Sequence, residues 1–197
     1  LLVFCSDNGG LPEIKPDTVG GLRGFKGSVF EGGMRVPCFI RWPGKVEPLR
    51  DDDTLASIID VVPTILEAAG IRAPEMVDGI KQAPIEGTSF AYTFDKENAE
   101  VPTRHTTQYF EMMGHRAIWA DGFKAVTFHD QGVPYDKDLW SLYKLDEDFS
   151  EMHDLSSTHP EKLQEMIALW WNEAERFGVL PLDDRGIEIF GTKSRPG

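Results

Sequence analysis

The first ten residues join a strand-like apolar run to a polar, glycine-containing loop. Residues 1–5 are apolar, and Ser6-Asp7-Asn8-Gly9-Gly10 follows directly. In open α/β sheets, ligands bind just beyond the carboxyl ends of the strands, where loop side chains converge. Asp7 and Asn8 would place a carboxylate and an amide oxygen there, and such oxygens suit Ca²⁺ or Mg²⁺. Taken alone, the same dipeptide fits an Asx-turn that simply leaves a strand.

Residues 1–98 alternate between strand-like and helical segments. Residues 36–42 form a second nearly continuous apolar run, which is typical of a strand covered on both faces. Residues 60–69 predict a helix with Asp60 as N-cap, a proline tolerated in the first turn and Gly70 as the C-terminal stop. The alternation predicts a layered α/β unit.

Residues 99–197 have a different pattern, and a polar stretch at 95–104 without apolar periodicity marks the boundary. Four segments have strand character: 106–112, 115–120, 123–129 and 140–145. The Asp121-Gly122 pair supplies the positive φ values of a tight hairpin. We expect a small antiparallel sheet of four strands.

The last strong element is a helix near residues 158–177. Thr158 and Glu161 fit a capping box, and Pro160 lies in the first turn, where its missing N–H costs nothing. Gly178 would end the helix. The apolar face consists of residues at helical spacing: Leu163, Met166, Ile167, Trp170, Ala174 and Phe177. We expect this face to pack across the small sheet as core.

Charge and hydropathy exclude some classes of partner. The net charge of −13 is spread over both halves of the chain, so no basic face is left for a nucleic acid. No apolar run approaches the roughly 20 residues that a membrane span requires, and no secretory signal is evident. The chain begins without methionine inside a predicted strand. We therefore expect an N-terminal portion to precede it, and the localisation stays open.

The sequence contains two cysteines, Cys5 and Cys38, each within an apolar strand-like stretch. A free thiol in such a position usually behaves as a small hydrophobic side chain. Neither cysteine has the spacing of a metal ligand or of a catalytic pair. We expect packed thiols rather than a disulfide or a nucleophile.

A loop rich in glycine and basic residues covers residues 20–37. Arg23, Lys26 and Arg35 lie in it, Arg41 follows, and Glu31 is its single acid. Ammonium groups and bare backbone amides could hold an oxyanion at close range. The alternative is a flexible surface loop with solvated charges.

Together the two loops resemble the sulfatase family of the alkaline-phosphatase-like superfamily. The family pattern is S-D-N-G, a variable loop, and G-x-x-x-x-E-G-G-x-R-x-P, with a lysine six residues before the paired glycines. The matching residues are Ser6-Asp7-Asn8-Gly9, Lys26 and 31–37. Further similarity, to the bacterial arylsulfatase branch, covers 58–71, 84–90, 108–126, 142–155 and the tail to Arg185. The likeness covers nearly the whole chain, as the C-terminal portion of a family member.

The resemblance implies an α/β fold: residues 1–98 as the C-terminal part of an alkaline-phosphatase-like sandwich and catalytic domain, and residues 99–197 as the small four-stranded subdomain with one packed C-terminal helix. It implies that Asp7 and Asn8 bind a divalent cation, Ca²⁺ or alternatively Mg²⁺, and that Lys26 is a catalytic residue holding a sulfate oxygen. For Arg35 we expect a structural ion pair.

By this resemblance, the intact enzyme is an arylsulfatase-like hydrolase that cleaves a small sulfate monoester to an alcohol or phenol and sulfate. Family members use a formylglycine nucleophile made within a C/S-x-P-x-R motif, and the sequence contains no such motif. We expect that group in a missing N-terminal part, and an inactive chain on its own. Two alternatives stay open: a phosphate or phosphonate monoester hydrolase of the same superfamily, or a non-enzymatic anion-binding module. Exposed edges of the truncated α/β unit could also support an oligomer.

The five histidines all fall in the second half of the chain, and none forms a metal-spaced pair. A surface or packing role is the default for each of them. His105, beside the expected domain junction, is the best candidate for acid–base work.

Overall fold

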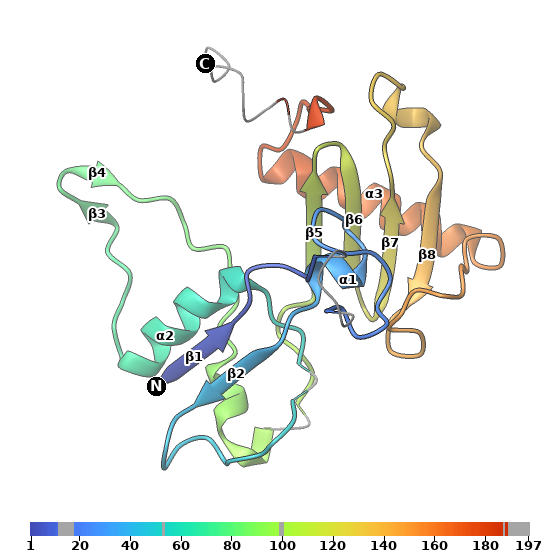
Figure 1. The fold of residues 1–197 in the computed structure, drawn as a ribbon. Coiled ribbons are helices and arrows are strands. Elements are labelled where there is room, and N and C mark those ends of the chain that lie inside the picture. The colour runs from blue at the N-terminus through green and yellow to red at the C-terminus, as the bar shows by residue number, and fades with distance from the viewer. Residues whose placement is uncertain (12–17, 53, 99–100, 187, 189–197) are drawn as a thin grey trace. The chain divides into compact units, whose positions relative to one another are not determined.

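The computed structural model describes residues 1–11, 18–52, 54–98, 101–186 and 188 (Figure 1). Two compact units are present: Leu1–Asp7 with Pro37–Thr106 forms unit 1, and Asn8–Val36 with Thr107–Gly197 forms unit 2. The glycine loop thus folds with the C-terminal sheet rather than with the strands on either side of it. Residues 99 and 100 of the expected linker lie outside the described residues.

In unit 1, β1 (Leu2–Cys5) pairs antiparallel with β2 (Cys38–Arg41). Ile40 packs against a cluster formed by three aromatic side chains, Phe90, Tyr92 and Phe94. The opposite face leaves Leu2, Phe4 and Phe39 58%, 65% and 64% exposed. The prediction that both strands are covered on both faces is therefore wrong for this chain, because this two-stranded sheet is packed on one side only.

The predicted helix of unit 1 is present as α2 (Val61–Ala69), and Gly70 closes it with a left-handed φ of 68°. Asp60 occupies the N-cap position, as expected, but its side chain does not cap the helix. Its carboxylate instead accepts hydrogen bonds from the backbone N–H groups of Ser57 at 2.7 Å and Thr88 at 2.6 Å. The short elements of unit 1 are η1 (Ile58–Asp60), β3 (Met76–Val77), β4 (Ile80–Lys81), η2 (Ala91–Phe94) and η3 (Lys96–Asn98).

Unit 2 contains the predicted antiparallel sheet, in the order β5-β6-β7-β8. Its strands are β5 (Thr107–Met112), β6 (His115–Ala120), β7 (Phe123–Thr127) and β8 (Trp140–Lys144). Asp121 and Gly122 have φ values of 51° and 76°, which confirms the tight turn between β6 and β7. A short helical turn, η4 (Tyr135–Lys137), precedes β8.

Helix α3 (Pro160–Arg176) lies along one face of this sheet (Figure 1). The predicted apolar stripe is confirmed: Leu163, Met166, Trp170 and Ala174 are buried. The predicted capping box is wrong, because the N-cap is His159 without a side-chain cap, and the Thr158 hydroxyl donates to the carbonyl of Leu155.

The other face of the sheet is covered by the glycine loop and by α1 (Glu31–Met34) (Figure 1). Ala117, Val126, Tyr143 and Leu145 form a buried cluster with Val29 of the loop. Because alternate residues of a strand face opposite sides, this cluster is distinct from the one that meets α3. Unit 2 therefore has three layers: helix, sheet and loop.

Trp170 is the largest fully buried side chain, and its indole N–H donates to the carbonyl of Phe110 at 3.0 Å. Trp170→Phe keeps a ring but removes that hydrogen bond and part of the buried side-chain volume, so we expect it to lower the free energy of unfolding by about 1–3 kcal/mol. Urea denaturation would measure this. Trp171→Phe is the matched control, since that ring is only partly buried. Equal effects of the two substitutions would contradict the layered packing.

Candidate functional site

The two predicted site segments are joined by backbone hydrogen bonds within unit 2. The N–H of Gly9 donates to the carbonyl of Gly33 at 2.9 Å, and the N–H of Lys26 donates to the carbonyl of Gly10 at 3.0 Å. Gly9 and Gly10 are thereby held against the glycine loop at two points, Gly33 and Lys26 itself. The two segments are therefore in contact through their backbones.

The glycines permit this contact because there is no room for a side chain. A Cβ atom on Gly9 would lie 1.8 Å from the carbonyl oxygen of Gly32, and one on Gly33 would lie 2.1 Å from that of Ser28. Such distances are far inside van der Waals contact. The paired glycines of both motifs thus serve close backbone approach rather than flexibility.

The predicted site side chains are accessible. Asp7 and Lys26 are exposed and Asn8 is partly buried. Within the described part of the chain, neither the Asp7 carboxylate nor the Lys26 ammonium has a hydrogen-bond or ion-pair partner. Both groups are therefore free to contact a ligand.

A buried ion cluster holds the glycine loop on the sheet. The ammonium of Lys124, on β7, lies 2.8 Å from Glu31 Oε1 and 2.8 Å from Glu151 Oε1. Glu151 Oε2 also accepts the backbone N–H of Glu31 at 2.7 Å. Relative exposures are 6% for Glu31, 0% for Lys124 and 1% for Glu151. We call these three residues the Lys124 cluster.

The guanidinium groups of the loop have structural partners. Arg35 Nε donates to Glu31 Oε2 at 2.7 Å, the structural ion pair expected from the sequence. Arg23 donates to the Tyr143 hydroxyl at 2.6 Å and lies 4.1 Å from the centre of the Phe30 ring. Among the described residues, Lys26 is then the loop cation without an ionic or aromatic partner.

The pKa values of the two carboxylates of the Lys124 cluster are shifted in opposite directions. Burial acts to raise the pKa of Glu31, but the charges and hydrogen bonds of Lys124 and Arg35 outweigh it, and the pKa is lowered. For Glu151 burial prevails over Lys124, and the negative charge of Glu31 adds to it, so its pKa is raised. Glu31 is therefore the firmly ionised member of the cluster.

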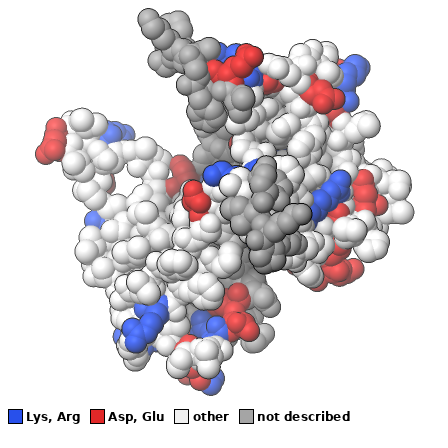
Figure 2. Space-filling model, viewed as in Figure 1, with Lys and Arg blue, Asp and Glu red and all other residues white. Residues whose placement is uncertain are grey.

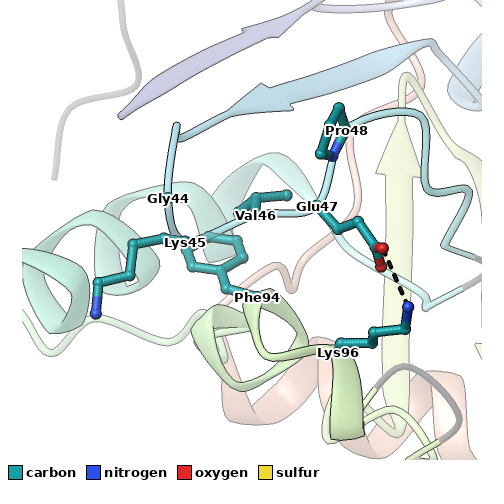
Figure 3. A pocket seen from close by; sticks show the side chains of 7 residues that line it. All are labelled: Gly44, Lys45, Val46, Glu47, Pro48, Phe94 and Lys96. Atoms are coloured by element: carbon teal, nitrogen blue, oxygen red, sulfur yellow. Dashed lines mark hydrogen bonds and ion pairs between the residues drawn. The ribbon is translucent and has the colours of Figure 1, made fainter.

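Neither the charge distribution on the described surface nor the hollow in unit 1 indicates a second binding site. On the face drawn in Figure 2, acidic and basic side chains are interspersed over the described surface. Unit 1 has an open hollow of about 340 Å³, lined by residues 44–48, Phe94 and Lys96 (Figure 3). Lys96 there pairs with Glu47 at 3.0 Å, and none of the predicted site residues lines the hollow.

His105, the histidine favoured from the sequence, is 7% exposed in unit 1. Its Nδ1 lies 2.7 Å from Asp60 Oδ2, the same carboxylate that binds Ser57 and Thr88. This pair fastens the end of the unit to the start of α2.

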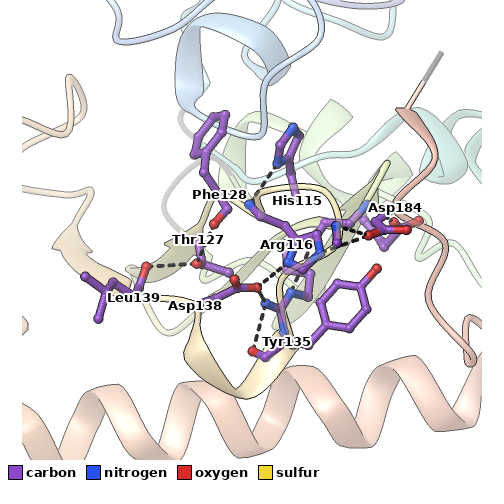
Figure 4. Close-up of polar contacts among 12 residues, drawn as sticks. His115, Arg116, Thr127, Phe128, Tyr135, Asp138, Leu139 and Asp184 are labelled. Atoms are coloured by element: carbon purple, nitrogen blue, oxygen red, sulfur yellow. Dashed lines mark hydrogen bonds and ion pairs between the residues drawn. The ribbon is translucent and has the colours of Figure 1, made fainter.

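A polar cluster around His129 was not predicted from the sequence (Figure 4). Asp138 binds both Arg116 and His129 Nδ1, the latter at 2.8 Å. The Tyr135 ring stacks on His129 with 3.9 Å between centroids, and Asp184 Oδ2 lies 3.6 Å from His129 Nε2. The cluster ties the segment between β7 and β8, and the C-terminal tail, to the sheet. Its members are too far apart in sequence to form a motif.

The donor set for a metal is incomplete. Within the described residues, no group of three or more His, Cys, Asp or Glu side chains could hold a metal ion. Asp7 and Asn8 supply hard oxygen donors, whereas Ca²⁺ takes about 6–8 oxygens. The two residues fit part of a calcium site, and other groups would have to complete it.

The fold and the joined loops define a protein of the sulfatase class. Residues 24–175 match the family model described as "N-sulphoglucosamine sulphohydrolase, C-terminal", and the chain belongs to this sulfatase family. An uncharacterized sulfatase of Schizosaccharomyces pombe is 32% identical over 84% of this chain and 30% of its own length. Arylsulfatase K of Xenopus laevis is 26% identical over 84% of this chain and 29% of its own length.

Solved structures agree with this assignment. The crystal structure of Ps i-CgsB has a TM-score of 0.68 at 26% identity, covering 93% of this chain and 37% of that one. The structure of BT4656 in complex with its substrate, D-glucosamine-2-N,6-O-disulfate, has a TM-score of 0.57 at 20% identity, over 79% of this chain and 31% of that one. At this level of identity the similarity supports the fold alone. The chain thus spans about a third of the length of the proteins it matches. Of the described helices, none is both long and apolar enough to cross a membrane.

Lys124→Met would leave two carboxylates buried together without their shared cation. We expect it to lower the free energy of unfolding by about 3–5 kcal/mol, because removing one partner of a buried ion pair leaves an uncompensated charge. Chemical denaturation measures this. The matched control is Lys144→Met, whose ammonium pairs with the exposed carboxylate of Asp146. If both variants lose equally little stability, the cluster does not anchor the loop.

The contact between His115 and the backbone of His129 predicts that the stability of the fold depends on pH. Burial and the neighbouring His129 lower the pKa of His115, although Asp130 and Asp138 oppose them. Its Nδ1 accepts the backbone N–H of His129 at 3.1 Å, which requires an unprotonated nitrogen. Because the pKa of His115 is lower in the folded than in the unfolded state, its contribution to the free energy of unfolding is complete above pH ~6.5. That contribution is lost as the pH falls below this value.

Thermal melts of wild type and His115→Asn between pH 7.5 and 5 test this. The variant keeps an acceptor but cannot titrate, so its melting temperature should fall less on acidification. His153→Asn, at a side chain that is 84% exposed, serves as control. A His115→Asn profile that parallels wild type would refute the assignment.

Proposed function

We propose that the protein hydrolyses a sulfate monoester, with Asp7 and Asn8 as ligands of a divalent cation and Lys26 as a catalytic contact to sulfate. Family membership supports sulfate-ester hydrolysis. The single observation that supports these roles is the pair of backbone hydrogen bonds that joins the glycine loop, at Lys26 and Gly33, to Gly10 and Gly9. We propose Ca²⁺ as the cation, with Mg²⁺ as the alternative.

The proposed chemistry follows from charge. Sulfuryl transfer builds negative charge on the peripheral and leaving oxygens, which fixed positive groups stabilise. The Lys26 ammonium, a compact charge on a flexible stem, suits one oxygen of a tetrahedral anion. Asp7 and Asn8 would supply two of the oxygen ligands of the cation. The cation, when bound, supplies further positive charge to the sulfate group.

In this proposal the nucleophile is not one of the residues of this sequence. No C/S-x-P-x-R segment occurs in the sequence, so a formylglycine would come from elsewhere, and the chain alone should not turn over a chromogenic aryl sulfate. We propose an arylsulfatase-type small-molecule substrate, since relatives include arylsulfatase K and, over 43% of this chain, a mouse steryl-sulfatase at 38% identity. We further propose that residues 1–98 belong to the catalytic domain and 99–197 to the C-terminal subdomain.

Calorimetric titration of the chain with sulfate, in the presence of Ca²⁺, tests the role of Lys26. Loss of a charged hydrogen bond is worth about 1.5–3 kcal/mol, so Lys26→Ala should weaken binding by roughly 10- to 100-fold. Lys81→Ala is the matched control, because that lysine is exposed in the β3–β4 hairpin. Titration with Ca²⁺ applies the same logic to Asp7→Ala, with the exposed Asp51→Ala as control.

Equal sulfate affinity in the Lys26→Ala and Lys81→Ala chains would overturn the proposed contact. Tighter binding of phosphate than of sulfate would favour a phosphate or phosphonate monoesterase. Tight sulfate binding without Ca²⁺, unaffected by Asp7→Ala, would favour an anion-binding module.

A further inference from the structure

The two cysteines lie opposite one another across the β1–β2 pair. The register places Cys5 against Cys38, next to the Phe4–Phe39 pair. From the sequence both were expected to be packed thiols, because each lies in an apolar stretch and neither has the spacing of a metal ligand or a catalytic pair. That expectation is wrong for Cys38, which is exposed, and the register brings the two cysteines together although 32 residues separate them.

The hydrogen-bond pattern identifies the type of pair. The N–H of Ser6 donates to the carbonyl of Pro37 at 3.4 Å, which makes Ser6–Pro37 a hydrogen-bonded pair. Hydrogen-bonded and non-hydrogen-bonded pairs alternate along antiparallel strands. Cys5–Cys38 is therefore a non-hydrogen-bonded pair, in which the Cα atoms lie about 4.5 Å apart and the side chains are closest. That spacing falls within the range of about 4.4–6.8 Å seen in disulfides.

Both thiols are free, and small reagents can reach them. Cys38 is exposed and Cys5 is partly buried. The two side chains share the sheet face of Val3 and Ile40, opposite to that of Phe4 and Phe39. Burial raises the pKa of the Cys38 thiol, and the neighbouring Cys5 thiol raises it further. The thiols are thus close enough to influence one another, and Cys38 should react slowly, since the thiolate is the nucleophile.

We propose that Cys5 and Cys38 are a modification site that forms a reversible cross-strand disulfide in exchange with a low-molecular-weight disulfide. The thiolate of Cys38 attacks one sulfur of the reagent and expels one thiolate, leaving a mixed disulfide. The thiolate of Cys5 then attacks the Cys38 sulfur and expels the second. In sum, two protein thiols are oxidised to one disulfide, and the reagent disulfide is reduced to two thiols.

The bond would close a covalent loop that contains Asp7, Asn8 and Lys26. It would clamp the two strands where β1 leads into the polar loop and where the glycine loop enters β2. The Ser6–Pro37 hydrogen bond lies directly beyond the Cys5–Cys38 pair at that end. This inference is independent of the proposed function, since it depends only on register and accessibility.

The test oxidises the native chain with oxidised glutathione at low protein concentration and then counts free thiols and measures mass. We expect titratable thiols to fall from two to none in a monomer whose mass drops by two hydrogen atoms, with a non-reduced peptide joining Cys5 to Cys38. Reduction should restore both thiols. Cys5→Ser and Cys38→Ser controls should give only mixed disulfides or linked dimers.

A second measurement separates fold-directed pairing from chance. In glutathione redox buffers, the native chain should favour the internal disulfide by more than about tenfold over the chain in urea, because the native strands have already closed the loop. The proposal would be overturned if the wild-type chain formed two stable mixed disulfides or intermolecular dimers. Equal equilibrium constants for the internal disulfide with and without urea would overturn it as well.

Discussion

The structure of unit 2 depends on one buried lysine. Lys124 places its ammonium between Glu31 of the glycine loop and Glu151 beyond β8, and both contacts measure 2.8 Å. Burying a charge is costly unless it is paired and hydrogen-bonded, so the loop cannot leave the sheet without exposing or unpairing these groups. Glu151 also adopts a left-handed backbone with φ of 56°, a strained conformation for a residue with a side chain. The interactions of its carboxylate with Lys124 and with the Glu31 amide offset that strain.

This anchor links the fold to the site. Glu31, Arg35 and Arg23 give their charges to internal contacts, and the glycines allow two loop backbones to interlock. Lys26 lies between these anchored points with a fixed backbone and a free side chain. A cation held in this way loses little backbone freedom when it binds an anion, which is the condition for preorganised electrostatic stabilisation. The small sheet therefore has a role in the proposed site without contributing a residue that touches sulfate.

Much of the architecture could be predicted from local sequence patterns. The Asp121-Gly122 turn, the antiparallel sheet of four strands and the apolar stripe of α3 each depend on neighbouring residues, and each is confirmed. The prediction of Thr158 as the helix cap was wrong, because its hydroxyl donates to the carbonyl of Leu155 in the preceding turn. The Lys124 cluster was missed because its members lie on three distant segments, and the Cys5–Cys38 pair because strand register is not visible in either strand alone. The roles of Asp7, Asn8 and Lys26 remain proposals derived from the motif.

The Lys124 cluster anchors the glycine loop to the sheet, and amide hydrogen exchange tests this anchoring most directly. In wild type, the Gly9 and Lys26 amides should exchange slowly, because each donates a backbone hydrogen bond between the two loops. In Glu151→Gln, which weakens the grip on Lys124, those amides should exchange much faster while the β5–β6 amides keep their protection. Unchanged protection of Gly9 and Lys26 in that variant, or fast exchange already in wild type, would contradict the account.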